Sequence, residues 1–518
     1  MMDSLLLLPI ILPIVTGIGM LVSSFLDHLR AKEKAVVSYS QKECKKINLL
    51  TGGILLLSVA AALYAAWSGE KSVTLFYLME DLPVYFHIDS LGRLFVTFLS
   101  IVWLAAGIYS FLYMEHEGEE KRFFGFYLLV YGVLVAQDFA GNLITLYLFY
   151  ELMTLTAMPL VMHNGTKEAI MAGLKYLFYS VCGAYLSLFA IFFLYQNCDT
   201  LTFKAGGTLN QVLAEGNQGI LQIAAMCMII GFGAKAGLFP LHAWLPTAHP
   251  VAPAPASAVL SSIIVKSGVF SIIRGVFYIF GADFLRGTWV QTTWMTLTLV
   301  TVFMGSLLAY REKVFKKRLA YSTVSQVSYI LFGLSLLSGE GMTGALLHTV
   351  CHAFIKCALF LTAGIFIFRT GKATVDEYRG IGKKMPFTLW CYTFASLALI
   401  GIPPTSGFIS KWYLAQGALQ TDVGEFSYLG PIVLLISALL TAGYLLPITM
   451  TGFFPGKEFA KDESEAASDR KEHAEKSTEK IDKMSGMLFV LVALAVIIGI
   501  LPNPLIDYVS EIGAMLMK

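Results

Sequence analysis

Charged residues are scarce in this sequence. Only 14% of its 518 residues are Asp, Glu, Lys or Arg, whereas an ordinary soluble domain carries about 25%. Hydrophobic residues make up 56%, and the mean hydropathy is +0.69. The formal net charge is only +2, and no basic patch is interleaved with aromatic residues. The composition therefore excludes a soluble globule and argues against nucleic-acid binding.

Paired cysteines are also missing. Seven cysteines are scattered along the chain and none forms a C-x-x-C pair, so neither a disulfide framework nor an iron–sulfur site is indicated. We therefore expect no cofactor and no redox chemistry in this chain. The sequence starts at Met1 without a basic segment or a small-residue cleavage site, so the first apolar stretch is expected to be retained.

Apolar runs of about 20 residues, the length that crosses a hydrocarbon core of about 30 Å, recur along nearly the whole chain. They predict an all-α membrane protein with about fourteen transmembrane helices. The predicted spans are 4–25, 47–67, 90–113, 123–139, 141–163, 168–195, 218–240, 255–281, 288–310, 319–338, 340–369, 386–416, 426–454 and 484–510.

Lysine and arginine lie mostly in the loops that follow odd-numbered spans. The main clusters are in 30–46, 311–318, 369–384 and the charged stretch 455–483. Basic loops stay in the cytoplasm, so we predict that both termini lie outside a cell (inner) membrane. The stretch 455–483 is read as a solvated cytoplasmic loop without a chemical role.

Six ionisable residues interrupt the apolar runs. They are Glu151, Lys175, Lys235, Lys266, Lys356 and Lys411. A charge at mid-membrane depth costs about 2.5 kcal/mol or more, so each needs a partner, water or a function. Structural ion pairs are the alternative, but the spans hold about five lysines for one clear acid, with Asp138 near a helix end. Burial and mutual repulsion then favour neutral lysines for part of the time, which suits proton relay.

Two histidines share a helical face with one of these lysines. His348, His352 and Lys356 follow the spacing i, i+4, i+8. The pattern H-x-x-x-H can bind zinc, but it lacks a third ligand and a lysine shares the face, so we expect no metal. Histidine titrates near neutral pH, which favours proton transfer. His242 and His249 lie near a predicted helix break and fit either a pathway or a structural role.

Proline interrupts two predicted spans at comparable places. The seventh contains Pro240 after Lys235, and the twelfth contains Pro403 and Pro404 before Lys411. Proline removes a backbone donor and clashes with the preceding turn, so helices 7 and 12 are expected to be broken. Paired broken helices indicate an inverted repeat with ion sites at its interface.

We therefore predict two inverted five-helix repeats flanked by other segments. The predicted divisions are 1–113 (helices 1–3), 114–281 (first repeat, helices 4–8), 282–454 (second repeat, helices 9–13), 455–483 (charged loop) and 484–518 (helix 14).

Three motifs resemble one known family. They are Tyr150-Glu-Leu-Met, Lys235-Ala-Gly-Leu-Phe-Pro-Leu-His-Ala-Trp-Leu-Pro and His352-Ala-Phe-Ile-Lys. They are similar to the antiporter-like membrane subunits of respiratory complex I, of energy-converting hydrogenases and formate hydrogenlyases, and of multisubunit cation/proton antiporters. The likeness covers about residues 85–455. It implies a fourteen-helix core with two inverted repeats, each holding a half-channel around a broken helix, and no redox centre in this subunit.

Two further comparisons bear on the branch of this family. The stretch that begins Leu245-Pro-Thr-Ala-His looks closest to the hydrogenase and formate hydrogenlyase branch. The long lateral helix of the most distal complex I subunit has no matching sequence here, so we do not expect that particular subunit.

Roles in the first half-channel follow from the resemblance. Glu151 looks like the acid of the fifth helix, and Lys235 like the lysine of the broken seventh helix. The resemblance implies that their pairing controls the proton affinity of the lysine. Lys266 resembles the relay of the eighth helix.

The resemblance also assigns roles around the second half-channel. His348, His352 and Lys356 are similar to the central connection between the two halves. Lys411 looks like the terminal residue, at a position where some relatives have glutamate.

The predicted function is proton translocation through two half-channels, in a subunit of a redox-driven complex of the energy-converting hydrogenase or complex I type. The predicted partners are other membrane subunits, lipid, and peripheral subunits of the complex. The peripheral subunits are expected to be hydrogenase-like or linked to a quinone or ferredoxin, and to hold the iron–sulfur and metal centres. The alternative is a subunit of a multisubunit sodium/proton antiporter. Lysines suit protons better than Na⁺, which is coordinated by carboxylates or carbonyls. If the subunit were only a structural scaffold, replacing the lysines would leave transport unchanged.

Overall fold

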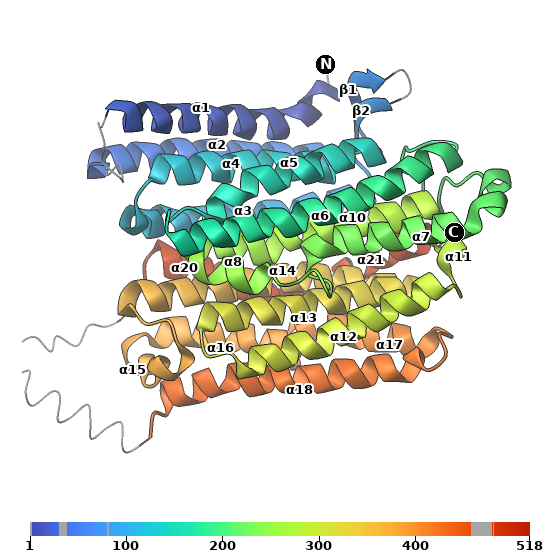
Figure 1. The fold of residues 1–518 in the computed structure, drawn as a ribbon. Coiled ribbons are helices and arrows are strands. Elements are labelled where there is room, and N and C mark those ends of the chain that lie inside the picture. The colour runs from blue at the N-terminus through green and yellow to red at the C-terminus, as the bar shows by residue number, and fades with distance from the viewer. Residues whose placement is uncertain (1–2, 31–38, 80–81, 457–478, 480, 518) are drawn as a thin grey trace, which may run out of the picture.

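Long helices run side by side through most of the protein (Figure 1). The computed structural model describes residues 3–30, 39–79, 82–456, 479 and 481–517. In the N-terminal part the elements are η1 (Asp3–Leu7), α1 (Leu8–Arg30), α2 (Gln41–Trp67), β1 (Ser72–Met79), β2 (Leu82–His87), α3 (Ser90–Glu117), α4 (Glu120–Asp138), α5 (Leu143–Val161) and α6 (Lys167–Asn197).

The middle of the chain contains several short helices. Its elements are α7 (Gln211–Ala236), α8 (Leu245–Val251), α9 (Ala254–Val259), the π-helical η2 (Leu260–Ile264), α10 (Val265–Gly275), the π-helical η3 (Val276–Phe280), α11 (Ala282–Leu285), α12 (Trp289–Arg311) and α13 (Phe315–Ser335).

The C-terminal part returns to long helices. Its elements are α14 (Gly339–Thr370), η4 (Val375–Tyr378), α15 (Ile381–Lys384), α16 (Pro386–Ile400), α17 (Ser406–Gln420), α18 (Phe426–Phe453), α20 (Lys483–Ile500) and α21 (Asn503–Leu516).

In the described part of the chain, 11 helices are long and apolar enough to cross a membrane. This confirms a multi-span, mainly helical membrane protein. The count of fourteen stays a prediction, because α4 and α13 are less apolar and α16 and α17 are short. Most of the predicted charged loop 455–483 lies outside the described residues.

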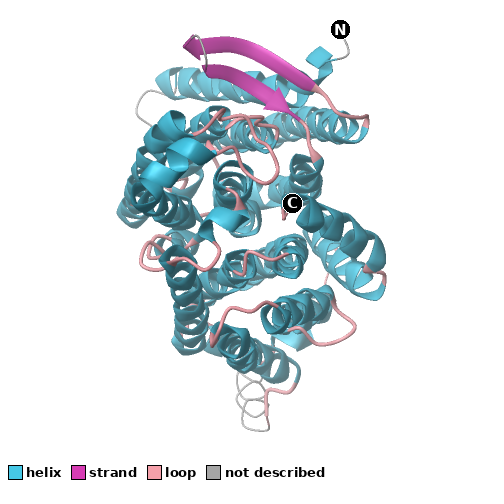
Figure 2. Cartoon of the chain, turned by 90° about the vertical axis from the view of Figure 1, so that its right-hand side faces the viewer, coloured by secondary structure: helices cyan, strands magenta, loops and turns pink. Residues whose placement is uncertain are grey.

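A two-stranded hairpin was not predicted by the hydropathy pattern. β1 and β2 pair antiparallel, with Ser72 opposite His87, and connect α2 to α3. The hairpin lies at the end of the bundle where α1 begins and α21 ends (Figures 1 and 2). We call the opposite end, where α1, α12, α14 and α18 end, the basic end, because the Lys- and Arg-rich connections lie there.

Helix α14 forms the centre of the bundle. It packs against α9, α13, α16, α17, α20 and α21, and 94% of its most apolar window is buried. The segment 254–280, which contains α10, is fully buried as well. By contrast, only 33–39% of the apolar windows of α1, α6 and α18 is buried, as expected for helices that face lipid. The helices that carry Lys266, His348 and His352 are therefore surrounded by protein.

Helical geometry stops at both proline-containing stretches. α7 ends at Ala236, and Gly237 follows with a φ of 78°; α16 ends at Ile400, and Gly401 follows with a φ of 94°. Glycine adopts this left-handed conformation without a Cβ penalty, so each glycine ends its helix. Whether each pair of flanking helices makes one broken span, and whether the chain divides into two inverted repeats, stay predictions.

Candidate functional site

Lys235 lies in a buried pocket of hydroxyl groups near the end of α7. Its side chain is fully buried. Nζ donates hydrogen bonds to Thr154 Oγ1 at 2.5 Å and to Tyr176 Oη at 3.1 Å. The rings of Tyr150 and Tyr176 lie 5.2 and 4.8 Å from Nζ, close enough for cation–π attraction. These groups can hold the lysine in either its charged or its neutral form.

Glu151 is near this lysine but is not paired with it directly. The carboxylate is half-buried and accepts a hydrogen bond from Tyr147 Oη at 3.2 Å. Among the described residues no ion pair joins Glu151 to Lys235, although the two charges interact through space. Thr154, one helical turn from Glu151 on α5, makes the direct contact with the lysine.

Lys266 connects α10 to α14. Its Nζ lies 2.7 Å from His352 Nδ1 and donates to the carbonyl of Ser261 at 2.8 Å. The side chain is 1% exposed. It follows directly after the π-helical η2, a distortion often found at functional sites. Lys266 is therefore in direct contact with the face of α14 that carries the two histidines.

The two histidines continue this contact towards α17. The rings of His352 and His348 are stacked with centroids 5.8 Å apart, and His348 Nδ1 lies 2.9 Å from Ser410 Oγ. His348 also stacks on Tyr329 at 5.5 Å, and Lys411 Nζ lies 5.0 Å from the same tyrosine ring. Nε2 of both histidines is buried without a protein partner. Such atoms need water or a transferable proton.

Lys411 is fixed by the end of α16. Its Nζ donates to the carbonyls of Leu399 and Ile400 at 2.7 and 3.0 Å. These carbonyls are left without helical partners where α16 stops, and a cation there also complements the helix dipole. The helix interruption therefore creates the binding position of this lysine.

Two predicted residues make no hydrogen bond within this series. Lys356 is fully buried, and its Nζ bonds Ser322 Oγ and the carbonyl of Leu319 on α13, whereas Lys266 bonds His352. Lys175 is half-buried on α6, and in the described structure it makes no hydrogen bond or ion pair. The roles of both stay predictions.

Sequence reasoning missed a buried charge pair. Arg274, two turns after Lys266 on α10, is 1% exposed and binds Asp89 through both guanidinium ends, at 2.5 and 2.7 Å. It was overlooked although it stands inside an apolar run, where the same criterion that singled out the lysines applies. Asp138 lies nearby, buried, with Oδ2 unpartnered.

His249 and His242, for which the sequence allowed either a pathway or a structural role, differ in their surroundings. His249 is fully buried, stacks on Phe360 at 4.6 Å, and has both ring nitrogens without a protein partner. His242 is more exposed and stacks on Phe239 at 5.9 Å. The unpartnered nitrogens of His249 fit a hydrated site better than a purely structural one.

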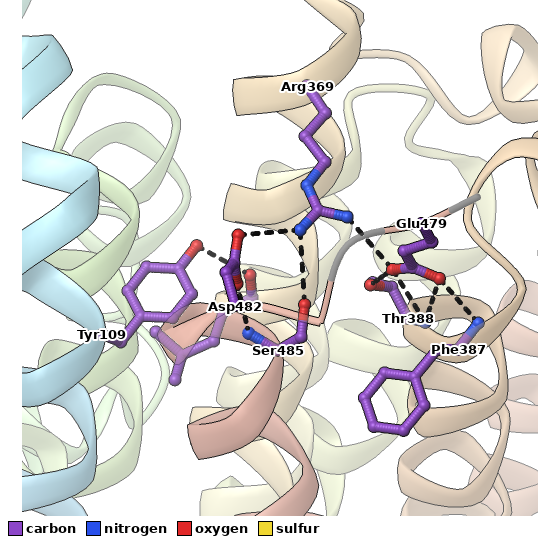
Figure 3. Close-up of polar contacts among 8 residues, drawn as sticks. Tyr109, Arg369, Phe387, Thr388, Glu479, Asp482 and Ser485 are labelled. Carbon is purple, nitrogen blue, oxygen red and sulfur yellow. Dashed lines mark hydrogen bonds and ion pairs between the residues drawn. The ribbon is translucent and has the colours of Figure 1, made fainter. Parts of the chain in front are cut away.

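An acidic clamp anchors three helices of this region at the basic end (Figure 3). Arg369, in the last turn of α14, binds Glu479 at 3.1 Å and Asp482 at 2.9 Å. Glu479 also accepts a hydrogen bond from the backbone N–H of Phe387, at 2.7 Å, and contacts Thr388 at the start of α16. Asp482 caps α20. The clamp therefore fixes α14, which carries the two histidines, and α16, whose last carbonyls bind Lys411.

Replacing Arg369 with glutamine is expected to lower the free energy of unfolding by about 3 kcal/mol, because it leaves the 3% exposed carboxylate of Glu479 without its cation. Thermal unfolding of the purified protein in detergent measures the change. Arg286→Gln is the matched control: its ion pair with Asp283 is largely exposed, and the expected loss is below about 1 kcal/mol. Equal losses in the two variants would contradict a stabilising clamp.

Metal-binding geometry is not found in the part of the chain that the structure describes: no three His, Cys, Asp or Glu side chains gather there. The seven cysteines are free thiols.

The fold defines a polytopic helical membrane protein with lysine and histidine side chains buried inside its bundle. Residues 140–454 match the family described as "NADH:quinone oxidoreductase/Mrp antiporter, TM". The chain belongs to this family, and it is an antiporter-like membrane subunit, as its sequence motifs indicated.

Its relatives include a subunit of an oxidoreductase, a component of a hydrogenase and a subunit of an antiporter. The chain is 32% identical to NADH-quinone oxidoreductase subunit N of Desulforudis audaxviator, over 71% of this chain and 72% of that protein. It is 32% identical to Hydrogenase-4 component B of Escherichia coli, over 80% and 62%. It is 26% identical to an Na(+)/H(+) antiporter subunit of Alkalihalophilus pseudofirmus, over 100% and 98%.

A solved structure shares the fold along the full length. A chain of the Mrp complex from Dietzia sp. DQ12-45-1b aligns with a TM-score of 0.81 at 21% identity, covering 100% of this chain and 98% of that one.

Proposed function

We propose that this subunit translocates protons along a row of ionisable side chains within a redox-driven membrane complex. The row consists of Glu151, Lys175, Lys235, Lys266, His348, His352, Lys356 and Lys411. The observation that carries the proposal is the contact series from Lys266 through His352 and His348 to Ser410. It joins the two predicted repeats through groups that each accept and release a proton. A structural scaffold has no need for buried histidine nitrogens without partners.

Charge coupling would drive the transfer at the first half-channel. A negative Glu151 stabilises an ammonium at Lys235 through space, and loss of that negative charge favours release of the proton. Thr154 and Tyr176 hold Nζ in place during the change. The proton would then pass to Lys266 and the histidines and leave near Lys411.

The proposed architecture follows the two helix interruptions. Segments 114–281 and 282–454 would form the inverted repeats, with helices 7 and 12 as their broken members, beside Lys235 and Lys411. The basic end would face the cytoplasm and both termini the outside, because Lys and Arg accumulate in cytoplasmic loops. The start of the first helical element, η1, and the end of the last helix, α21, both lie at the hairpin end, opposite the basic end (Figure 1). This position supports the proposed orientation.

The energy source would lie in partner subunits. We propose a hydrogenase- or complex I-like assembly, in which peripheral subunits carry the iron–sulfur and metal centres and use a quinone or ferredoxin. The similarity to Hydrogenase-4 component B and to NADH-quinone oxidoreductase subunit N supports this choice.

A sodium/proton antiporter is the second candidate, and one observation favours it. The Na(+)/H(+) antiporter protein of Alkalihalophilus pseudofirmus aligns over the whole chain, whereas only 62% of Hydrogenase-4 component B is covered. Against it stands the cationic character of the row, because lysines repel Na⁺ and offer it no oxygen ligands.

Proton uptake by vesicles that contain the intact complex distinguishes the two candidates. With the electron donor present, we expect proton movement to continue at the same rate when all sodium salts are replaced by choline salts. Movement that stops without sodium, or that needs only a sodium gradient and no electron donor, would favour the antiporter.

A further inference from the structure

The two histidines of α14 each bond through one ring nitrogen and leave the other without a partner. His352 Nδ1 lies 2.7 Å from Lys266 Nζ, and His348 Nδ1 lies 2.9 Å from Ser410 Oγ. Nε2 of both rings is buried and unbonded in the described structure. A neutral imidazole carries one proton, and the hydrogen bond at one nitrogen determines which nitrogen holds it. The two bonds at Nδ1 therefore assign a tautomer to each ring.

Lys266 determines the tautomer of His352. A lysine nitrogen has three protons when it is charged and two when it is neutral. Nζ donates one of them to the carbonyl of Ser261 at 2.8 Å, so a further proton remains for Nδ1 of His352 in either state. Nδ1 then accepts, and the proton of the neutral His352 ring lies on Nε2.

Ser410 imposes the opposite tautomer on His348. Ser410 is fully buried, and its Oγ donates to the carbonyl of Gly407 at 3.1 Å. A hydroxyl group has a single proton. Because this proton is directed at Gly407, Oγ can only accept from His348, so Nδ1 of His348 carries the ring proton. Nε2 of His348 is then a free acceptor.

The two opposite tautomers make the free nitrogens complementary. Nε2 of His352 is a donor and Nε2 of His348 is an acceptor, on rings one helical turn apart whose centroids are separated by 5.8 Å. A proton can pass from His352 to His348 directly or through one bridging water. Two rings with the same tautomer would present two donors or two acceptors, and this transfer would be blocked.

One passage through the pair moves one proton and stores none. Lys266 protonates Nδ1 of His352, and His352 gives its Nε2 proton to Nε2 of His348. His348 then releases its Nδ1 proton through Ser410 towards Lys411, the next residue of the row. Both rings are left in the reversed tautomer and must return before the next passage. The bond that Ser410 makes to the backbone favours this return at His348.

We propose that Ser410 is a positioning residue, which holds His348 in the Nδ1–H tautomer and so keeps the histidine pair ready to receive a proton from Lys266. The purpose of this arrangement rests on the proposed proton translocation. The tautomers themselves are a property of the folded subunit, and they can be measured without transport.

The first test is nitrogen NMR spectroscopy of the full-length subunit, isotope-labelled at histidine and reconstituted in lipid bilayers, at a pH at which the rings are neutral. His348→Leu and His352→Leu identify the two rings among the nine histidines. We expect the proton on Nδ1 of His348 and on Nε2 of His352. Ser410→Ala is expected to lower the ratio of Nδ1–H to Nε2–H in His348 about fivefold, the equivalent of one lost neutral hydrogen bond. Ser410→Thr keeps the hydroxyl and should keep the ratio.

The second test is the rate of proton uptake by vesicles that contain the assembled complex. Ser410→Ala is expected to lower this rate about fivefold, since the same hydrogen bond is lost, and Ser410→Thr to retain it. Ser406→Ala is the matched control. Ser406 is a buried serine on the same helix whose hydroxyl bonds neither histidine, so both the tautomers and the rate should stay unchanged.

Three results would overturn the inference about Ser410. They are a proton on Nε2 of His348 in the wild type, a tautomer ratio that Ser410→Ala leaves unchanged, and wild-type translocation by Ser410→Ala beside an inactive Lys235→Met. Wild-type translocation by Lys235→Met would instead refute the proposed function, whichever tautomers are measured.

Discussion

Lys235→Met is expected to lower the rate of proton translocation by about 70-fold or more. The side chain is fully buried, and it is the titratable group that bonds both Thr154 and Tyr176. Without it, a proton must cross this region as an unrelayed charge, which costs at least about 2.5 kcal/mol, and this corresponds to about 70-fold in rate. Methionine keeps a long side chain, so the helix packing should survive.

The measurement is the initial rate of proton uptake into vesicles with the assembled complex, together with the rate of electron transfer by the partner subunits. Lys46→Met, which removes an exposed lysine at the start of α2, is the matched control and should translocate normally. Thr154→Val keeps the lysine but removes its shortest contact, so an intermediate rate is expected. Wild-type translocation by Lys235→Met would exclude the proposed row.

The geometry around Lys235 also refines how the acid acts. The family resemblance implies that Glu151 and Lys235 form a pair. In the structure it is Thr154, also on α5, that makes the direct hydrogen bond with the ammonium of Lys235. Spacing along a helix predicts which face a residue shares, since Glu151 and Thr154 are one turn apart. It does not predict which of the two reaches a neighbouring helix, because that depends on how α5 and α7 cross.

The helices were predictable for a physical reason. A membrane span needs about 20 apolar residues and internally satisfied backbone, so hydropathy alone reports most long helices. The hairpin of β1 and β2 escaped the same criterion, because it lies between spans and is too short to register. The positions of Lys235 and Lys411 beside helix ends were also predictable, because glycine and proline terminate helices through local geometry.

Contacts between distant segments were not predictable in this way. Lys266 and His352 are 86 residues apart, and Arg369 and Glu479 are 110 apart. Composition showed that the lysines could not all be paired with acids. It could not show that Lys356 bonds α13 while Lys266 bonds the histidine, since the packing of α14 against η2 and α13 decides this.

His352→Leu is expected to reduce proton translocation as strongly as Lys235→Met, because it removes the acceptor 2.7 Å from Lys266 Nζ and the partner on which His348 stacks. If both residues lie on one path, the double variant should lose no more than either single variant, since a path that is already closed cannot be closed again. Cys351→Ala, beside it on α14, is the control for changes in helix packing. A partial loss in each single variant, with full loss only in the double variant, would instead place Lys235 and His352 on separate routes, each carrying its own share of the protons.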